Sequence, residues 1–366
     1  MRLLDLCDIK YGYAFDSKRF TDNPIYPPLV RIRDVKRGFS ETFYAGEYSK
    51  EYLLHKGDLL IGMDGEFNIA RWKSVDALLN QRVCKISAKK GTNEEYIRFA
   101  LSKKLKNIED KTSFVTVKHL SARELSTIEF TMPEYEKQRK IADILVSIEN
   151  IIEKKKQELE QLDTFVKSRF AEMFGNPLNG TAKYPIHQVG EVANSVDPQP
   201  SHRTPPVEED GVPYVSIKDC DYKTGKIDFE GARKVSPKVL EEHLNRYTLH
   251  EGDFVIGKIG TIGNPVFIPA RDDYTLSANI VLVQPNRELV SPYFLKYSFE
   301  SDFVERQFAE AKNSTSQAAF GIQKVRTVKV MNPDLDVQNK FENFVQQVDK
   351  SKFGGKKLEE TARNGK

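Results

Sequence analysis

Residues 133–175 carry a long, regular hydrophobic pattern that constrains the fold more strongly than any other stretch. Pro133 suits the first turn of a helix, and Gly175 suits its end. Between them, apolar residues alternate at spacings of four and three, the period of a coiled coil, with Lys155 interrupting one core position. The seam comprises Ile141, Leu145, Ile148, Ile152, Leu159, Leu162 and Val166. At ~1.5 Å per residue this pattern predicts a rod of roughly 60 Å, which needs a partner helix to cover its stripe.

The whole chain has 366 residues, enough for two or three domains with their own cores. It is 39% hydrophobic and 30% charged, which indicates a folded protein rather than a disordered one. No apolar run is long enough for a membrane span or a signal peptide. Cys7, Cys84 and Cys220 are scattered and have no metal-binding spacing. We therefore expect a cytoplasmic protein with no structural zinc.

The first 132 residues predict an α+β domain in which strands dominate. Short β-favouring stretches at residues 29–33, 58–63, 83–87 and 128–131 are separated by turn signals such as Lys56-Gly57 and Asp64-Gly65. A helix is expected at residues 94–105, where Asn93 can cap its start. This segment has the largest basic excess of the chain, with 23 Lys and Arg against 18 Asp and Glu. This modest excess does not by itself indicate a nucleic-acid-binding protein.

The same order of short motifs appears again after the rod. Residues 30–34 return at 215–219, and the stretch from His55 to Gly62 returns from His250 to Gly257. Residues 79–83 have a looser counterpart at 277–281, helices begin near Tyr96 and Tyr293, and Gln138 matches Gln338. The offset between the copies drifts from 185 to 200, as expected if surface loops differ in length. The sequence therefore predicts an internal duplication.

A second amphipathic helix is expected after Pro333, because Phe341, Val345 and Val348 form an apolar stripe. It is shorter than the first, with Gly354-Gly355 weakening its end. The two helices should pair antiparallel, since the intervening domain must return the chain. The predicted domains are residues 1–132, 133–175 (central helix), 176–332 and 333–366 (distal helix). The fold class is α+β, with two β-rich domains joined by an antiparallel two-helix coiled coil.

This arrangement resembles the specificity subunits of type I restriction–modification systems. The resemblance rests on the duplicated order of domain and helix, on the junction from Ile128 to Gln138 with its weaker copy from Val328 to Gln338, and on the Gly-Asp-apolar-Gly element at 57–62 and 252–257. It implies that each β-rich domain is a target-recognition domain for one half of a bipartite DNA site. The implied partners are double-stranded DNA, two adenine-methylating modification subunits that bind S-adenosylmethionine, and a restriction translocase. The chain itself would bind no cofactor or metal.

Basic and polar side chains near strand ends and loops are the candidate DNA contacts, because Arg and Lys bind phosphates and Arg also matches the edge of guanine. They are Arg31, Arg33, Lys36, Arg37, Asn68, Lys111, Lys118, Arg203, Lys218, Lys223, Lys258, Thr261 and Asn264. Solvated strand faces, a tight hairpin at 257–264 and simple connectors are the alternatives. At the end of the rod, Phe165, Phe170, Met173 and Phe174 predict either a docking site for a partner subunit or packing against the second domain.

The sequence shows no motif typical of a catalytic site. The glycines at 257, 260 and 263 do not form a dinucleotide-binding motif, and no phosphate-binding loop or hydrolase elbow occurs. The six histidines have no metal-ligand spacing. We therefore expect a non-catalytic DNA-recognition subunit. A duplicated protein-binding scaffold and a stand-alone nucleic-acid enzyme are the rival hypotheses.

Overall fold

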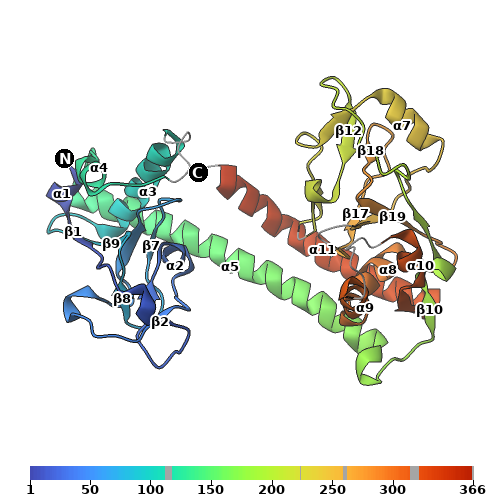
Figure 1. The fold of residues 1–366 in the computed structure, drawn as a ribbon, viewed down its shortest axis with the longest axis horizontal. Helices are drawn as coiled ribbons and strands as arrows, with labels where there is room; N and C mark the ends of the chain where they lie inside the picture. The colour runs from blue at the N-terminus through green and yellow to red at the C-terminus, as the bar shows by residue number, and fades with distance from the viewer. Residues whose placement is uncertain (112–117, 223, 259–261, 314–320, 365–366) are drawn as a thin grey trace. The chain divides into compact units, whose positions relative to one another are not determined.

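The computed structural model describes residues 1–111, 118–222, 224–258, 262–313 and 321–364, without the side chains of 111, 312–313 and 353–364. The chain forms two compact units (Figure 1). Unit 1 comprises Met1–Lys155 with Glu360–Lys366, and unit 2 comprises Lys156–Glu359. None of the helices in the described ranges is both long and apolar enough to cross a membrane.

Unit 1 is built on two small sheets. The first is antiparallel in the order β1 (Cys7–Tyr11), β9 (Val83–Ala88), β6 (Leu59–Gly62) and β7 (Ile69–Arg71). The second has the order β3 (Leu29–Val30), β8 (Ala77–Leu79) and β5 (Leu53–Leu54), with β3 parallel to β8. A further pair joins β2 (Phe20–Thr21) and β4 (Phe43–Tyr44). The helices are α1 (Leu3–Leu6), α2 (Ile32–Arg37), α3 (Glu94–Lys111) and α4 (Ala122–Thr127).

Unit 2 repeats this plan with additions. Its antiparallel sheet has the order β11 (Ala193–Val196), β19 (Ile280–Pro285), β16 (Phe254–Gly257) and β17 (Val266–Phe267). The second sheet has the order β15 (Arg233–Val235), β12 (Val212–Val215) and β18 (Thr275–Leu276). Two further strand pairs are antiparallel. One joins β10 (Ile186–Gln188) with β20 (Lys329–Met331), and the other joins β13 (Cys220–Asp221) with β14 (Lys226–Ile227). The helices are α6 (Val189–Val192), α7 (Pro237–Leu244), α8 (Pro292–Phe299), α9 (Asp302–Asn313) and α10 (Ile322–Thr327).

The duplication predicted from the sequence is confirmed down to individual hydrogen bonds. The strand order β1-β9-β6-β7 equals β11-β19-β16-β17, and the strand pairs β3-β8 and β12-β18 are both parallel. The carboxylate of Asp34 accepts the Arg31 N–H at 2.9 Å, and Asp219 accepts the Ser216 N–H at 2.8 Å. These short acidic side chains start the helical turn that follows each strand, because they satisfy a backbone donor that no helical carbonyl can reach.

The structure shifts one alignment between the copies. Val30 pairs with Leu79 in unit 1, and Val215 pairs with Leu276 in unit 2. Leu79 therefore corresponds to Leu276, and the counterpart of residues 80–82 is 277–279. The sequence comparison, which matched 79–83 with 277–281, was wrong by one residue here.

Two predicted strands of unit 1 also differ from the structure. The strand expected at residues 29–33 ends at Val30, because Asp34 caps a helix that begins at Ile32. Residues 128–131 form no regular strand; the segment makes an isolated bridge between Glu129 and Arg2. The predicted helix at 94–105 is confirmed as α3, where the Asn93 side chain accepts the Tyr96 N–H at 2.9 Å.

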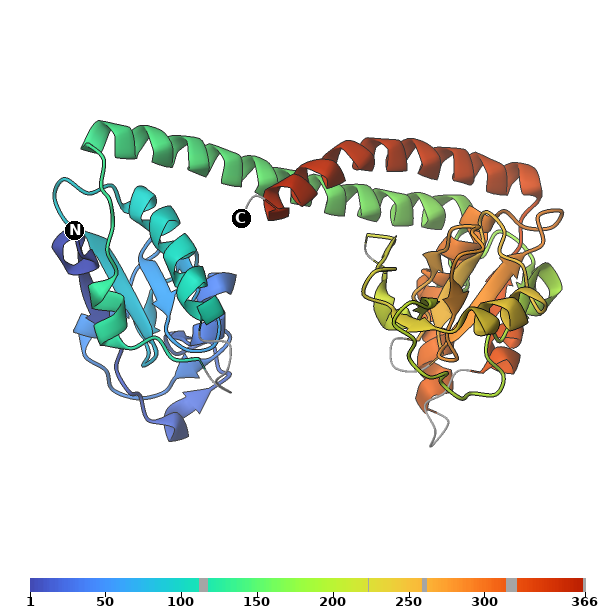
Figure 2. The ribbon, with the colours of Figure 1, turned by 90° about the horizontal axis from the view of Figure 1, so that it is seen from above.

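The rod is a single helix, α5 (Tyr135–Phe174), which ends where Gly175 adopts φ 78°, a conformation that favours glycine. Its second half lies beside α11 (Leu335–Asn364) in Figures 1 and 2. Partner numbers fall along α11 as they rise along α5, so the helices are antiparallel, as predicted. The contacts are Asp163–Lys352 at 2.6 Å, Phe165–Phe344 at 5.2 Å and Phe170–Phe341 at 5.3 Å between ring centroids.

The predicted seam is confirmed only in part. Its buried members are Val166, Phe341, Val345 and Val348, and Leu162 packs against the same core. Its half-buried members are Ile141, Leu145, Ile152 and Leu159. Ile148 is 46% exposed, so its assignment to the seam was wrong; Ala142 is buried on this part of the helix instead. The backbone of α11 continues past Gly354-Gly355 to Asn364, further than the predicted weakening suggested.

Aromatic side chains at the end of α5 form the core of unit 2. Phe174 lies 4.7 Å from Phe294 and 5.5 Å from Phe341 between ring centroids, and Phe170 stacks on Phe294 at 5.6 Å. For Phe170, Met173 and Phe174 the structure supports packing against the second domain, whereas Phe165 is 54% exposed and contacts Phe344 of α11. The three cysteines are buried free thiols, and burial raises the pKa of each to about 12.

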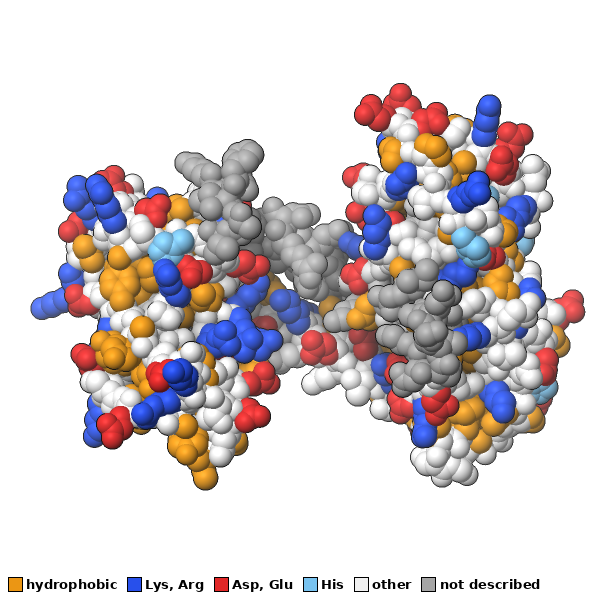
Figure 3. Space-filling model, in the orientation of Figure 1, with side chains coloured by type: hydrophobic (Ala, Val, Ile, Leu, Met, Phe, Trp, Pro, Cys, Tyr) orange, Lys and Arg blue, Asp and Glu red, His pale blue; other side chains and the backbone are white. Residues whose placement is uncertain are grey.

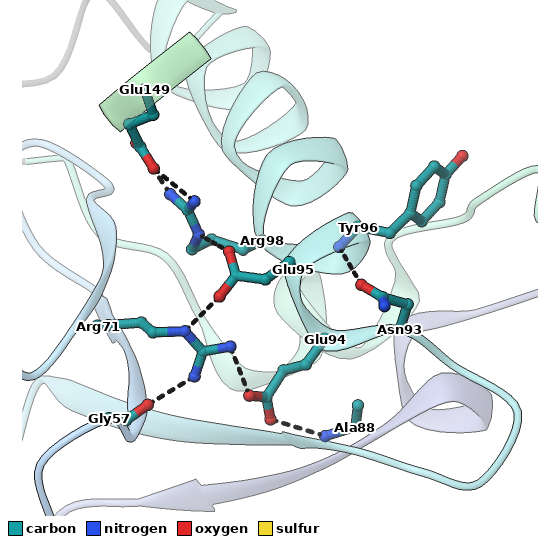
Figure 4. A network of polar contacts seen from close by, with 9 residues as sticks. All are labelled: Gly57, Arg71, Ala88, Asn93, Glu94, Glu95, Tyr96, Arg98 and Glu149. Carbon is teal, nitrogen blue, oxygen red and sulfur yellow. Dashed lines mark hydrogen bonds and ion pairs between the residues drawn. The ribbon is translucent and has the colours of Figure 1, made fainter. Parts of the chain in front are cut away.

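In unit 1, a network of ion pairs ends on α5 at Glu149 (Figure 4). Arg98 of α3 donates to both oxygens of Glu149 on α5, at 3.1 and 2.6 Å, and to Glu95 at 2.6 Å. Arg71 of β7 also pairs with Glu95, and with Glu94 at 2.8 Å. Burial raises the pKa of Glu95, but the hydrogen bonds from the two arginines outweigh it, so this pKa lies below its usual value.

Candidate nucleic-acid interface

An arginine-lined pocket in unit 1 gathers two of the predicted DNA contacts. It has a volume of about 420 Å³ and lies between the start of α2 and the turn that joins β8 to β9. Three guanidinium groups, two amides and a hydroxyl line it, together with Phe15, Phe20 and Ile32. The polar lining residues are Ser17, Arg31, Arg33, Asn80, Gln81 and Arg82. Because no carboxylate is among its lining residues, the pocket favours an anionic ligand.

Arg31 and Arg33 reach this pocket because β3 stops after Val30. Asp34 is buried and accepts the Arg31 N–H, which fixes the backbone, whereas the Arg31 side chain is exposed and makes no ion pair within the described residues. The Arg33 guanidinium has only long contacts, 3.5 Å to Thr42 and 3.7 Å to Asp34. Both groups therefore remain able to bind a phosphate or the edge of a base.

Asn80, Gln81 and Arg82 were not among the predicted contacts. They belong to the loosely repeated motif at 79–83, and nothing local in the sequence places them near Arg31. The parallel pairing of β3 with β8 brings the two segments together, and this pairing joins residues about fifty positions apart. Arg82 in turn contacts Asp64, at 3.5 Å, and His119, which also bonds to Asp64.

The remaining candidates of unit 1 lie on its surface with weak partners. Lys36 pairs with Glu66 at 3.2 Å, and Arg37 pairs with Glu41 at 3.5 Å. The Asn68 amide donates to the Glu66 carbonyl at 3.2 Å, and Lys118 lies 3.9 Å from Glu109. The exposed ion pairs of Lys36 and Arg37 contribute little to stability, so these two cations can exchange their partners for phosphates. The side chain of Lys111 lies outside the described residues.

In unit 2, Lys218 is exposed on a single 3₁₀ turn at Ile217–Asp219, the counterpart of the start of α2. Arg203 is also exposed, and Asn264 is half-buried. Lys223 and Thr261 lie outside the described residues. The structure therefore leaves Lys218 and Arg203 as the accessible predicted cations of this unit.

Lys258 does not fit its predicted role. It is 5% exposed, and its ammonium group bonds to Asp197 at 2.6 Å and to the Ala278 carbonyl at 3.3 Å. A buried cation paired with a carboxylate is not available to DNA, because breaking one side of such a pair leaves an uncompensated charge. We correct this assignment: Lys258 fastens the segment after β11 to the end of β16.

A second buried contact holds the same segment. The His243 ring on α7 bonds to Gln199 on one side and to Thr275 on the other. Burial lowers the pKa of His243, and the nearby Arg246 lowers it further. Arg246 also donates to the Asp197 carbonyl at 3.1 Å. The proline-rich segment at 198–206, which contains Arg203, is therefore anchored at its start.

Charged side chains of both signs are mingled on the visible face of each unit (Figure 3). Among the described residues, no group of three His, Cys, Asp or Glu side chains could hold a metal ion. The geometry offers a pocket that suits an anion.

Comparisons with known proteins agree with this geometry. The family model for the type I restriction modification DNA specificity domain matches residues 1–162 and 207–361, which covers both copies. The chain belongs to this family. It is a DNA specificity subunit, a non-catalytic recognition component of type I restriction–modification, as the sequence predicted, and the scaffold hypothesis is not favoured.

Individual relatives are distant but extensive. The specificity subunit of the type I restriction enzyme EcoBI from Escherichia coli is 26% identical over 94% of this chain and 77% of its own length. The MjaVIII specificity subunit from Methanocaldococcus jannaschii is 21% identical over 88% of this chain and 79% of its own. The crystal structure of the S subunit from M. genitalium superposes with a TM-score of 0.58 at 14% identity, covering 99% of this chain and 91% of that one. This last likeness supports the fold.

Proposed function

We propose that each β-rich domain of this specificity subunit reads one half of a bipartite DNA target. The observation that carries the proposal is the duplication itself: the family match covers both copies, and both have the same strand order. Two similar readers in one chain fit a target with two separate halves, because each reader can contact its own stretch of the groove.

Within each domain, we assign DNA contacts to basic and polar side chains near strand ends and loops. In the first domain these are Arg31, Arg33, Lys36, Arg37 and Lys118, with Asn68 beside them and Lys111 in the adjoining segment. In the second domain they are Arg203, Lys218, Lys223 and the loop of Thr261 and Asn264. Lys and Arg on phosphates supply affinity that is independent of sequence, and each contact makes binding more sensitive to salt.

The chemistry would belong to partner subunits. The MjaVIII and EcoBI relatives are named as specificity subunits of restriction enzymes, and one matched structure is described as showing complex assembly of a type I system. We infer that two modification subunits bind this chain in the cytoplasm and methylate adenine using S-adenosylmethionine. A restriction translocase would add cleavage. An adenine inside a duplex must be flipped out before it can be methylated, which explains why the reader and the catalyst are separate.

The test is methyl transfer by the reconstituted complex. This chain and the modification subunit encoded beside it are co-expressed, purified and incubated with labelled S-adenosylmethionine and genomic DNA from a strain that lacks both. Methylation of adenine should require both proteins. Equal methylation by the modification subunit alone would contradict the proposal, as would methyl transfer by this chain alone.

A further inference from the structure

The turn from Asn80 to Val83 forms part of the arginine pocket and has a rigid backbone. The Val83 N–H bonds to the Asn80 carbonyl at 3.2 Å, the Gln81 N–H to Tyr13 at 2.8 Å, and the Met63 N–H to the Arg82 carbonyl at 2.8 Å. The side chains of Gln81 and Arg82 are nevertheless exposed. A fixed backbone that presents exposed polar side chains is the arrangement that a recognition site requires.

Arg82 occupies its place against the preference of the backbone. Its φ is 69°, in the left-handed region, at the third position of the turn, where Gly or Asn is favoured. The second copy has Asn279 at this position. An arginine kept in a conformation that disfavours it points to a function for its side chain. The contacts with Asp64 and His119 orient its guanidinium group beside the pocket.

Asn80 supplies a separate observation. Its side chain is only 7% exposed, and its Oδ1 has no hydrogen-bond partner among the described residues. A buried acceptor without a donor is unfavourable in the free protein. Adenine and cytosine both carry an amino group that could donate to it, and Asn and Gln amides are the side chains that pair with adenine.

The two copies differ at the pocket while their frameworks agree. In unit 2 the places of Arg31, Arg33, Asn80, Gln81 and Arg82 are taken by Ser216, Lys218, Ser277, Ala278 and Asn279. Ser277 there bonds to Asn279, and the Ala278 carbonyl accepts from the buried Lys258. Duplicated domains that read different half-sites need their differences at the bases and their similarities elsewhere.

We infer that the Asn80–Gln81–Arg82 turn is the specificity-determining element of the first domain. Its side chains contact base edges of one half of the target, including a base with an amino group, while Arg31 and Arg33 bind neighbouring phosphates. This inference rests on the proposed function, in which this domain reads DNA.

The test replaces the turn by its counterpart and reads the methylated motif. The complex with the modification subunit carries the single variants Gln81→Ala and Arg82→Asn, or the triple graft Asn80→Ser, Gln81→Ala and Arg82→Asn. We expect methylation of the wild-type motif to fall about tenfold or more, with altered bases in the first half and an unchanged second half. Arg82→Asn should leave the unfolding temperature unchanged or raise it, because it relieves the left-handed arginine. Arg31→Ala should instead weaken binding to all DNA sequences. It should also reduce the slope of log K against log salt concentration by about one, because one phosphate contact is lost.

Lys90→Asn is the matched control, an exposed cation at the opposite end of β9 from Arg82. It should leave both halves of the motif unchanged. Wild-type methylation of the same motif by Gln81→Ala and Arg82→Asn would overturn the inference, and Gln81→Ala decides the matter even if the graft does not fold. If the wild-type complex methylates no bipartite motif, the proposed function fails rather than the assignment of this turn.

Discussion

Two copies of one fold make chemically different contacts at matching positions. In unit 1, Arg71 and Glu95 form an ion pair, and Arg98 connects Glu95 to Glu149 of α5 (Figure 4). In unit 2 the corresponding places of Arg71 and Glu95 hold Phe267 and Tyr293, whose rings lie 4.9 Å apart.

The position of Arg98 holds Lys296 in unit 2. Its ammonium group lies 4.4 Å from the centroid of the Tyr297 ring and bonds to Glu300 at 2.6 Å. The common fold therefore needs contact at these positions but does not require one kind of contact. Since ion pairs are screened by salt and aromatic packing is not, the two units should respond differently to the same perturbations.

The aromatic attachment should give the largest effect. Phe174 is fully buried among Phe170, Phe294 and Phe341. Phe174→Ala should lower the unfolding free energy of unit 2 by about 3–5 kcal/mol, because it removes a ring and leaves a cavity. Urea denaturation measures this. Ile148→Ala on the unit 1 half of the same helix is the control and should cost less than about 0.5 kcal/mol, since Ile148 is largely exposed. Equal costs would refute the difference between the two halves of α5.

A glutamine contact that both copies share should give the next largest change in the unfolding free energy. Gln138 accepts the Asn93 N–H at 2.9 Å and donates to the Pro133 carbonyl at 2.8 Å, while Gln338 makes the matching bonds with Ser291 and Pro333 at 2.8 and 2.6 Å. Each fastens the first turn of a long helix to its domain. Gln138→Ala and Gln338→Ala should each lower the unfolding free energy by about 2 kcal/mol, because backbone groups are left buried without partners.

The exposed neighbour Asn339 provides the control for this pair. Asn339→Ala should change the unfolding free energy by less than about 0.5 kcal/mol in the same denaturation experiment. A lower unfolding free energy in only one of the two glutamine variants would show that the two copies do not share this contact.

The ionic attachment should be sensitive to salt. Arg98→Ala should lower the unfolding free energy of unit 1 by about 1–2 kcal/mol in dilute buffer, and by less in 1 M salt, since Glu149 is half-exposed and screened. Tyr293→Ala, at the position of Glu95, changes the aromatic contact of unit 2, and its cost should be similar at both salt concentrations. Denaturation curves at the two ionic strengths compare them, and a salt-independent cost for Arg98→Ala would break the comparison.

The smallest effect concerns pH. Because the pKa of buried His243 is lowered, the unfolded chain binds more protons near its ordinary pKa of about 6.5. Stability of unit 2 from this group is therefore present above about pH 6.5 and falls as pH decreases below that value. His243→Gln should flatten this dependence in thermal unfolding. In unit 1, Glu95 has a lowered pKa, so its contribution is lost only as pH falls below about 4.3.

Features set by local pattern could be predicted from the sequence. The helix ending at Gly175, the duplication and the matched glutamines follow from periodicity and order, which the chain carries in short segments. The shift from strand to helix after Val30 was missed because it depends on one capping carboxylate. The exposure of Ile148 was missed because a heptad pattern does not say where along a helix a partner is present.

The candidate site was harder to predict because it is assembled from distant segments. Arg31 and Arg33 were found from their charge, whereas Asn80, Gln81 and Arg82 join them only through the pairing of β3 with β8. Lys258 was misassigned for the same reason: its partner Asp197 lies 61 residues away and cannot be inferred from the glycine-rich loop that follows it.

The most direct test of the central claim is the methylome of a host that expresses this chain with its neighbouring modification subunit, compared with a strain lacking only this chain. Two copies that each read their own half-site predict N6-methyladenine in a motif of two defined halves with a gap of fixed length. The account also predicts that this motif is unmethylated in the strain that lacks only this chain. A single uninterrupted motif, or the same methylome in both strains with expression confirmed, would contradict the account.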